Sequence, residues 1–148
     1  MLKQKKNEYR RKTTNYLQAN ASLEWEMIKN LKLKIMGGYS SNDYTAEAFN
    51  GSKTKTGNSN PNNTLSKGVN ASLGETRTRS YLNENTLSYE YNKMKHNLNA
   101  LLGFSVQRST AYTSSITQEY ITNESFGMAG LGKGESTPVV TSSKGENK

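Results

Sequence analysis

The stretch NYLQANASLEWEMI, residues 15–28, decides the fold class because apolar and polar side chains alternate without a break from Leu17 to Met27. Its apolar positions are Leu17, Ala19, Ala21, Leu23, Trp25 and Met27. Its polar positions are Gln18, Asn20, Ser22, Glu24 and Glu26. A period of two predicts a β-strand with one apolar and one polar face, whereas a helical period would place Leu17 beside Asn20 and Ala21. The run is also about twice the length of a usual strand in a soluble sheet.

A second alternating stretch follows a short interruption at Lys29 and Asn30. One face carries Leu31, Leu33, Ile35, Gly37 and Tyr39, and the other face carries Lys32, Lys34 and Gly38. The adjacent Gly37 and Gly38 indicate a bulge or a close approach of the backbone. Two long strands joined by so short a break predict a tight hairpin, which spans about residues 14–41.

The residues between about 42 and 72 are rich in Gly, Asn, Ser, Thr and Lys and predict a long polar loop. Such loops are uncommon in compact soluble domains but usual on the outer side of a membrane β-barrel. Alternation returns in a second hairpin over about residues 76–113, with its turn between Asn92 and Lys95. A second long loop is expected over about residues 114–148, where Gly, Ser and Thr return.

The second hairpin also has an apolar face, formed by Leu87, Tyr89, Tyr91, Leu98, Ala100, Leu102, Phe104 and Val106. If the alternation of Leu87, Tyr89 and Tyr91 is extended toward the N-terminus, Asn83 and Asn85 also fall on this face. Two polar residues there suggest a bulge, or a part of the strand that lies beyond the membrane. Strand, tight turn, strand and long loop, repeated along the chain, form the pattern of outer-membrane barrels.

The composition limits the class of protein. Only 32% of the 148 residues are apolar and the mean hydropathy is −0.89, so a soluble globule of this length would be short of core. Nine Tyr, three Phe, one Trp and only two Pro favour β-structure over disorder. The sequence lacks the roughly 18 consecutive apolar residues of a membrane-spanning helix, whereas a barrel strand needs only about 9 to 11 alternating residues. It also has no cysteine, which excludes disulfides and thiolate metal sites.

The net charge of +8 includes a basic cluster near the N-terminus, formed by Lys3, Lys5, Lys6, Arg10, Arg11 and Lys12. One interpretation is a footprint for nucleic acid or anionic lipid. We favour a solvated segment that leads into the first strand, because the remaining charge is dispersed and no nucleic-acid-binding motif accompanies it. The first basic residues are not followed by an apolar stretch, so no signal peptide is predicted and we expect a fragment of a longer exported protein.

Four segments together resemble the SusC/RagA family of TonB-dependent outer-membrane receptors. They are residues 21–34, which resemble the family hairpin LEW/Y-x-I-I-K-G-L-x-L, and residues 82–89, 96–105 and 127–131. The segments keep the order of neighbouring barrel strands, and the resemblance extends over nearly all of the chain from Asn7 onward. Asn30 stands where the family usually has Gly in the turn, which leaves the turn type open.

The alternation and the resemblance together predict an all-β fold, an antiparallel meander of about four long strands within a large transmembrane β-barrel of roughly 22 strands. The resemblance implies an importer of glycans or other large nutrients in the cell outer membrane, powered through TonB and covered by a SusD-like lipoprotein. The family's plug, TonB-contacting segment and carboxypeptidase-like domain lie outside the matched segments. The alternatives are a surface-exposed β-barrel or adhesin-type interaction protein without transport activity, and a soluble nucleic-acid binder.

The two faces of the predicted strands divide the candidate site residues. Those expected to face outer-membrane lipid are Leu17, Leu23, Trp25, Leu31, Leu33, Ile35, Leu98, Leu102, Phe104 and Val106. Those expected to face the lumen are Glu24, Glu26, Lys32 and Lys34. Two carboxylates on one face are an alternative acid/base pair, but cross-strand ion pairs with the two lysines explain all four side chains.

No catalytic, cofactor-binding or metal-binding residue is predicted, and no enzymatic activity. His96 is the only histidine and is expected in a solvated turn. The glycine-rich residues 127–134 lack the spacing of a phosphate-binding loop and are interpreted as part of an extracellular loop.

Four aromatic side chains lie near predicted strand ends: Trp25, Tyr39, Tyr89 and Tyr91. They can be interpreted as a set that stacks on sugars or as a girdle at the membrane interface. We expect Trp25, Tyr89 and Tyr91 in the girdle, because they fall next to the tight turns. Contacts to a substrate are expected instead from the long loops, where Tyr44 and Phe49 lie.

Overall fold

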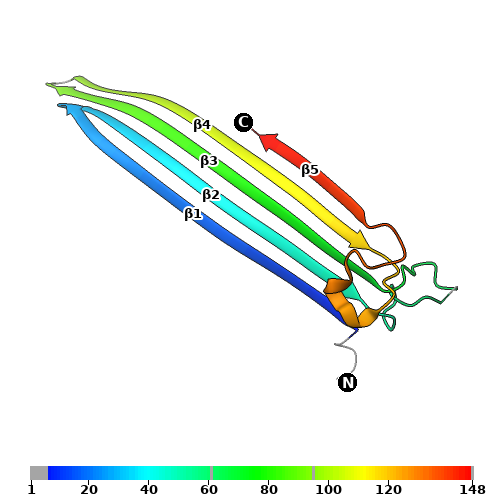
Figure 1. The fold of residues 1–148 in the computed structure, drawn as a ribbon. Coiled ribbons are helices and arrows are strands. Elements are labelled where there is room, and N and C mark those ends of the chain that lie inside the picture. The colour runs from blue at the N-terminus through cyan, green and yellow to red at the C-terminus, as the bar shows by residue number, and fades with distance from the viewer. Residues whose placement is uncertain (1–6, 61, 95, 148) are drawn as a thin grey trace. The chain divides into compact units, whose positions relative to one another are not determined.

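The computed structural model describes residues 7–60, 62–94 and 96–147. Within them the elements are β1 (Glu8–Ile28), β2 (Leu31–Asn50), β3 (Asn70–Lys93), β4 (His96–Gln118), the short 3-10 helix η2 (Glu124–Gly130) and β5 (Val139–Asn147). The strands form one sheet in the order β1-β2-β3-β4-β5, so that each strand pairs with its neighbour in sequence (Figure 1). The predicted all-β antiparallel meander is therefore confirmed, as an open sheet.

The strands are longer than the alternation alone indicated. The first hairpin was expected over about residues 14–41 and the second over about residues 76–113, but β2 continues to Asn50, β3 begins at Asn70 and β4 ends at Gln118. Backbone hydrogen bonds between strands do not require an apolar face, so polar residues outside the alternating zone also pair. The loop expected over residues 42–72 is correspondingly confined to residues 51–69.

The prediction of a loop over residues 114–148 is wrong in part, because this segment contains a strand, β5. Its sequence, VVTSSKGEN, is mostly polar and shows no long alternation. The strand forms because the free edge of β4 offers a row of unpaired backbone groups. Ser115 Oγ lies 2.7 Å from Thr141 Oγ1 and marks the contact between β4 and β5.

The structure divides into two compact units, which are described separately below. Unit 1 comprises Met1–Asn15, Asp43–Arg77 and Tyr112–Lys144. Unit 2 comprises Tyr16–Asn42, Thr78–Ala111 and Gly145–Lys148. Each of the long strands passes through both units.

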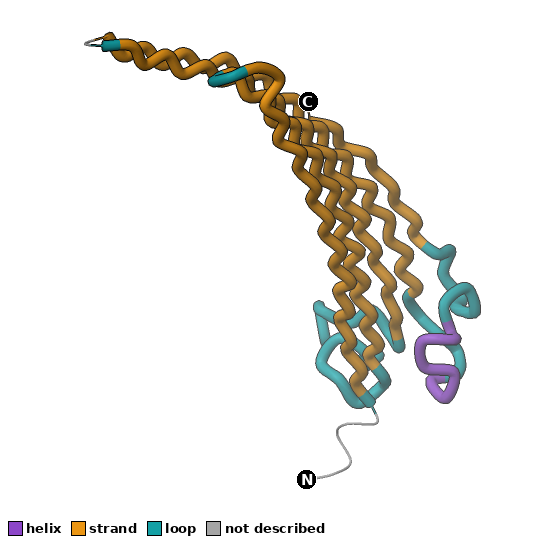
Figure 2. The backbone as a smooth tube through the Cα atoms, turned by 90° about the vertical axis from the view of Figure 1, so that its left-hand side faces the viewer, coloured by secondary structure: helices purple, strands orange, loops and turns teal. Residues whose placement is uncertain are grey.

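Unit 1 contains the buried apolar core, which lies where the long loops meet strand ends. Its buried members are Phe49 at the end of β2, Ala71 at the start of β3 and Ile121 in the loop after β4, all no more than 4% exposed. Val69, Met128 and Leu131 pack against them. In Figure 2, loops and η2 lie beside the ends of these strands. None of the helices in the described ranges is long and apolar enough to cross a membrane.

Gly68 is the glycine of unit 1 on which the contact between the two loops depends most directly. Its φ is +60°, and a Cβ atom there would lie 2.7 Å from Cδ1 of Tyr120 and 3.2 Å from its Cα atom. Left-handed backbone costs a residue with a Cβ about 1–2 kcal/mol, and the clash with the Tyr120 ring adds to this. The substitution Gly68→Ala is therefore expected to open the loop of residues 51–69.

Hydrogen exchange of the detergent-solubilised protein, followed by mass spectrometry, measures this opening. Gly74→Ala in β3 of the same unit is the matched control, because no heavy atom lies within 4 Å of a Cβ at that position. Faster exchange in residues 51–69 is expected for Gly68→Ala and not for Gly74→Ala. Equal exchange in the two variants would contradict the role assigned to Gly68.

Candidate functional site

The turn between β1 and β2 sets which side chains of unit 2 share a face. Asn30 has a left-handed φ of 69°. A Cβ atom on Gly38 would lie 2.9 Å from Oδ1 of Asn20, so these two residues are opposite one another. Counting from this pair toward the turn places Met27 opposite Leu31. Residues 28–30 then form a three-residue loop, and its last residue is the left-handed Asn30. The predicted tight hairpin thus carries one extra residue.

The extra residue places Glu24 and Glu26 on the same face of the sheet as Lys32 and Lys34. With a two-residue loop the lysines would have fallen on the opposite face. Glu24 Oε1 lies 3.9 Å from Lys32 Nζ, and both side chains are more than half exposed, so the pair contributes at most about 1 kcal/mol. Glu26 Oε1 instead accepts a hydrogen bond of 3.1 Å from the backbone N–H of Asn30, which fixes the turn.

The register between β2 and β3 extends the apolar face across the next strand. A Cβ atom on Gly38 would lie 3.4 Å from Cβ of Leu82, and the N–H of Glu90 donates to the carbonyl of Asn30 at 3.0 Å. The two pairs are separated by the same number of residues on both strands, so no bulge lies between them. This register places Leu33 opposite Leu87.

Asn83 and Asn85 therefore do point to the apolar face, and the suggested bulge is wrong. Asn85 Nδ2 donates to Asn83 Oδ1 at 2.6 Å, and Asn83 Nδ2 donates to the carbonyl of Met36 at 3.4 Å. Each amide thus finds a protein partner, which lowers the cost of placing it among apolar side chains.

The register between β3 and β4 completes the apolar face of unit 2. Ser80 Oγ and Ser109 Oγ lie 2.9 Å apart across the two strands. Counting from this pair places Leu87 opposite Leu102. The predicted lipid-facing residues with exposed side chains are Leu17, Leu23, Trp25, Ile35, Leu98, Leu102, Phe104 and Val106. Leu31 and Leu33 are partly buried by their neighbours.

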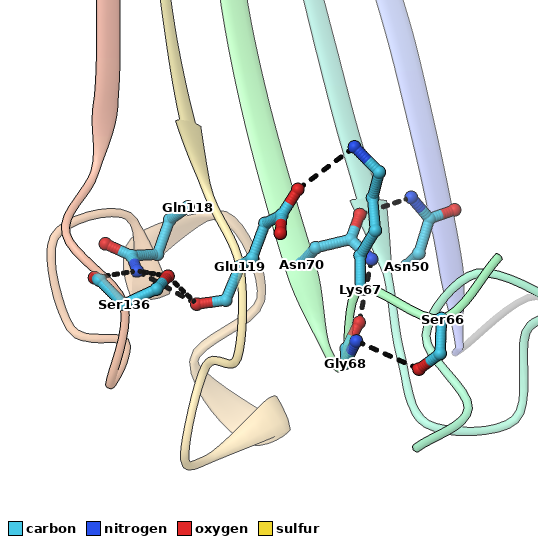
Figure 3. Close-up of polar contacts among 8 residues, drawn as sticks. All are labelled: Asn50, Ser66, Lys67, Gly68, Asn70, Gln118, Glu119 and Ser136. Atoms are coloured by element: carbon cyan, nitrogen blue, oxygen red, sulfur yellow. Dashed lines mark hydrogen bonds and ion pairs between the residues drawn. The ribbon is translucent and has the colours of Figure 1, made fainter. Parts of the chain in front are cut away.

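In unit 1, side chains join the two long loops and the strand ends to one another (Figure 3). Lys67 Nζ lies 3.0 Å from Glu119 Oε1, and Asn50 Nδ2 donates to Asn70 Oδ1 at 2.8 Å. The fully buried Gln118 donates from Nε2 to the carbonyl of Ser136 at 2.7 Å. The sequence carries no signal for this set, because Asn, Gln and Ser are common in every loop and have no characteristic spacing here.

Glu124 joins η2 to the first loop and has a perturbed acidity. The backbone N–H of Ser52 donates to Glu124 Oε2 at 2.9 Å. This hydrogen bond, then a side-chain hydrogen bond from Ser52 and the positive charge of Lys53, lower the pKa of Glu124 below its ordinary value of 4.5, against a small opposing effect of desolvation. The charged carboxylate is thus the form that holds the loops together.

The contact between Glu124 and Ser52 is expected to be fully present above pH about 4.5 and to be lost as the pH falls through the lower folded pKa. The sign follows because a carboxyl with a depressed folded pKa stabilises the fold only while it is ionised. The amide signal of Ser52, followed by NMR across this range, measures the transition. Glu124→Gln should flatten the titration, and a midpoint at or above 4.5 would contradict the assigned contact.

Several predicted residues lie elsewhere than expected. Phe49 is a buried core residue of β2, and Tyr44 also lies on β2, so neither is in a loop as the substrate-contact prediction required. The strand continues past the alternating zone and includes both residues.

His96 is the exposed first residue of β4, directly after the turn. Residues 127–134 include the end of η2, and Gly127 has a φ of 53°. No cluster that could hold a metal occurs within residues 7–60, 62–94 and 96–147.

Comparison with known proteins supports the fold. No protein-family model matches the sequence, and a search of curated proteins gives no match. Several solved structures match, and one of them aligns with a TM-score of 0.69 and 17% sequence identity. It is a structure of the RagAB peptide transporter. The alignment covers 95% of this chain and 15% of the transporter chain.

The chain therefore has the fold of a part of this transporter, an open antiparallel sheet of five strands that matches a segment of the RagA barrel. At 17% identity the likeness concerns the fold alone. It agrees with the barrel segment that the resemblance to the SusC/RagA family implied, while the activity, substrate and partners of the whole protein belong to the proposal below.

Proposed function

We propose that this chain forms part of the wall and outer loops of a TonB-dependent outer-membrane importer of the SusC/RagA kind. The observation that carries the proposal is the sheet of unit 2, in which one face is largely apolar across four paired strands. The other face is mostly polar, with Ile28, Met36 and Leu101 as its apolar exceptions. A soluble sheet would cover its apolar face with a second layer, but here large apolar side chains on that face are exposed. A lipid bilayer covers such a face.

The assignment of the faces follows from the same proposal. The lipid side carries Leu17, Leu23, Trp25, Leu31, Leu33, Ile35, Leu98, Leu102, Phe104 and Val106. The lumen side carries Glu24, Glu26, Lys32 and Lys34, whose charges require water. The tight turns then lie on the periplasmic side and the long loops on the outer side, as in other barrels of this class.

The cargo is proposed to be a large nutrient, a peptide or a glycan. The peptide alternative is supported by the fold match to a peptide transporter, and the glycan alternative by the resemblance to SusC-like receptors. TonB would supply the energy and a SusD-like lipoprotein would cover the outer opening. The wall proposed here carries no catalytic role. Deletion of the complete gene is expected to abolish growth on one such nutrient, and unchanged growth on a broad panel would count against import.

Cysteine labelling tests the placement of the wall directly. The chain contains no cysteine, so each introduced cysteine is unique within it. Single cysteines at successive positions from Leu98 to Gln107 should react with a water-soluble maleimide at every second position only. Ser105→Cys should be labelled from the lumen, whereas Leu102→Cys should be protected by lipid. Labelling of both positions at similar rates in intact outer membranes would overturn the proposal.

A further inference from the structure

A shallow groove lies on the apolar face of unit 2, where the otherwise continuous layer of large side chains is interrupted. Its volume is about 570 Å³. Small residues of β1 and β2, Ala19, Ala21 and Gly37, form its floor, and no heavy atom lies within 4 Å of a Cβ placed on Gly37. Val106 of β4 is part of its wall. The lining of the groove is therefore mostly apolar, and Asn83 is a polar residue within it.

Aromatic rings and a cation border the same groove. Tyr39 and Tyr81 both line it, and their ring centroids lie 5.1 Å apart at an angle of 45°. Arg108 of β4 also lines it. Tyrosine pairs with an apolar ring and a polar hydroxyl favour the headgroup level of a membrane. An arginine beside them provides a charge at the level where lipid headgroups lie.

The guanidinium of Arg108 has N–H donors available for a ligand although it already pairs with a carboxylate of the protein. Its Nη2 lies 2.7 Å from Glu146 Oε1, and its side chain remains 55% exposed. A guanidinium has five N–H donors in a rigid fork, so the bond from Nη2 leaves donors on the other nitrogens. This fork matches the oxygens of a phosphate group better than a lysine ammonium does.

The position of Arg108 fits the outer boundary of the bilayer. On the apolar face of β4, Arg108 is the first charged residue after Leu98, Ala100, Leu102, Phe104 and Val106. It lies ten residues beyond Leu98, which is about 34 Å along an antiparallel strand. At a strand tilt of about 40° this corresponds to roughly 26 Å across the membrane, close to the ~25 Å height of the apolar band of a barrel.

We propose that this groove binds one phosphorylated, acylated lipid of the outer leaflet, of the lipid A class. An acyl chain lies over the floor of Ala19, Ala21 and Gly37, and a phosphate group of the lipid accepts hydrogen bonds from Arg108. The inference rests on the proposed function, because it requires the apolar face to meet lipid. Charge complementarity between the guanidinium and the phosphate selects this lipid over a neutral one.

The test uses the complete barrel that contains this chain, purified in detergent and titrated by native mass spectrometry. The probes are lipid A, dephosphorylated lipid A and phosphatidylglycerol. We expect lipid A to bind about tenfold more tightly than its dephosphorylated form, which is the usual effect of a charge-assisted hydrogen bond. Arg108→Gln should remove this preference, and Arg108→Lys should retain part of it. Ala21→Leu places a larger side chain in the groove and should therefore weaken the binding of both lipid A and its dephosphorylated form.

Lys34→Gln is the matched control, because it removes the same charge from an exposed residue on the polar face. It should leave the preference for lipid A unchanged. The inference is overturned if Arg108→Gln retains the preference, if Lys34→Gln removes it equally, or if phosphatidylglycerol binds as tightly as lipid A. Should Leu102→Cys stay protected from the maleimide in that case, the proposed wall stands and only the lipid site is lost.

Discussion

An arginine in place of Leu102 is expected to destabilise the membrane-embedded barrel by about 2–4 kcal/mol, the cost of a cation on the lipid face near the bilayer midplane. Leu102 is 70% exposed in this sheet and lies opposite Leu87, in the middle of the apolar run of β4. In the part of unit 2 that the structure describes, the carboxylate on the apolar face is that of Glu146, which pairs with Arg108 and not with position 102. Much of the variant protein should therefore fail to assemble.

The same substitution three residues further along is the control for this prediction. Ser105 points to the polar face, where the register of β3 and β4 places it opposite Glu84, so Ser105→Arg gains an opposite charge in water. Urea unfolding of the barrel in lipid vesicles measures both variants. A loss of less than about 1 kcal/mol for Leu102→Arg, or an equal loss for Ser105→Arg, would be incompatible with the assigned faces.

In water without detergent, the chain expressed alone is expected to aggregate rather than to form a soluble monomer. The buried apolar core consists of Phe49, Ala71 and Ile121, while one face of four strands presents large apolar side chains. Faces of this kind and unpaired strand edges are sites of association.

Sedimentation after detergent removal measures this outcome. Replacing Leu98, Leu102, Phe104 and Val106 together by Ser should shift most of the chain to the supernatant. Replacing the polar-face residues Asn97, Asn99, Ser105 and Gln107 together by Ala should not. A wild-type chain that sediments as a monomer and melts cooperatively would contradict both this prediction and the barrel wall.

Several features were predictable because the signal lies within a single strand. The alternation from Leu17 to Met27 predicted β1, and the break at Lys29 and Asn30 predicted the hairpin, since side chains of a strand point alternately to its two faces. The ends of the strands were not predictable in the same way. Residues 42–50 extend β2 because β1 and β3 lie on either side and pair with its backbone.

The groove and the loop contacts also could not be predicted from the sequence. Ala19, Gly37 and Val106 are far apart in sequence and come together only through the pairing of strands. Arg108 looked like one dispersed charge among others. Phe49 looked like a loop residue that could meet a substrate, whereas it fills the core of unit 1. Long-range packing, which no local pattern encodes, decided all of these placements.

By itself, the sequence determined that the chain is all-β and that its strands have one apolar and one polar face, because both properties follow from residue order within each strand. Which faces of neighbouring strands combine was decided by the tertiary structure. The left-handed Asn30 adds one residue to the turn, and this places Glu24 beside Lys32 rather than on the opposite side of the sheet. A shift of one residue in register moves every side chain of a strand to the opposite face of the sheet. Alternation within one strand therefore does not determine which of its faces joins the apolar face of the next strand, and the pairing between the strands does.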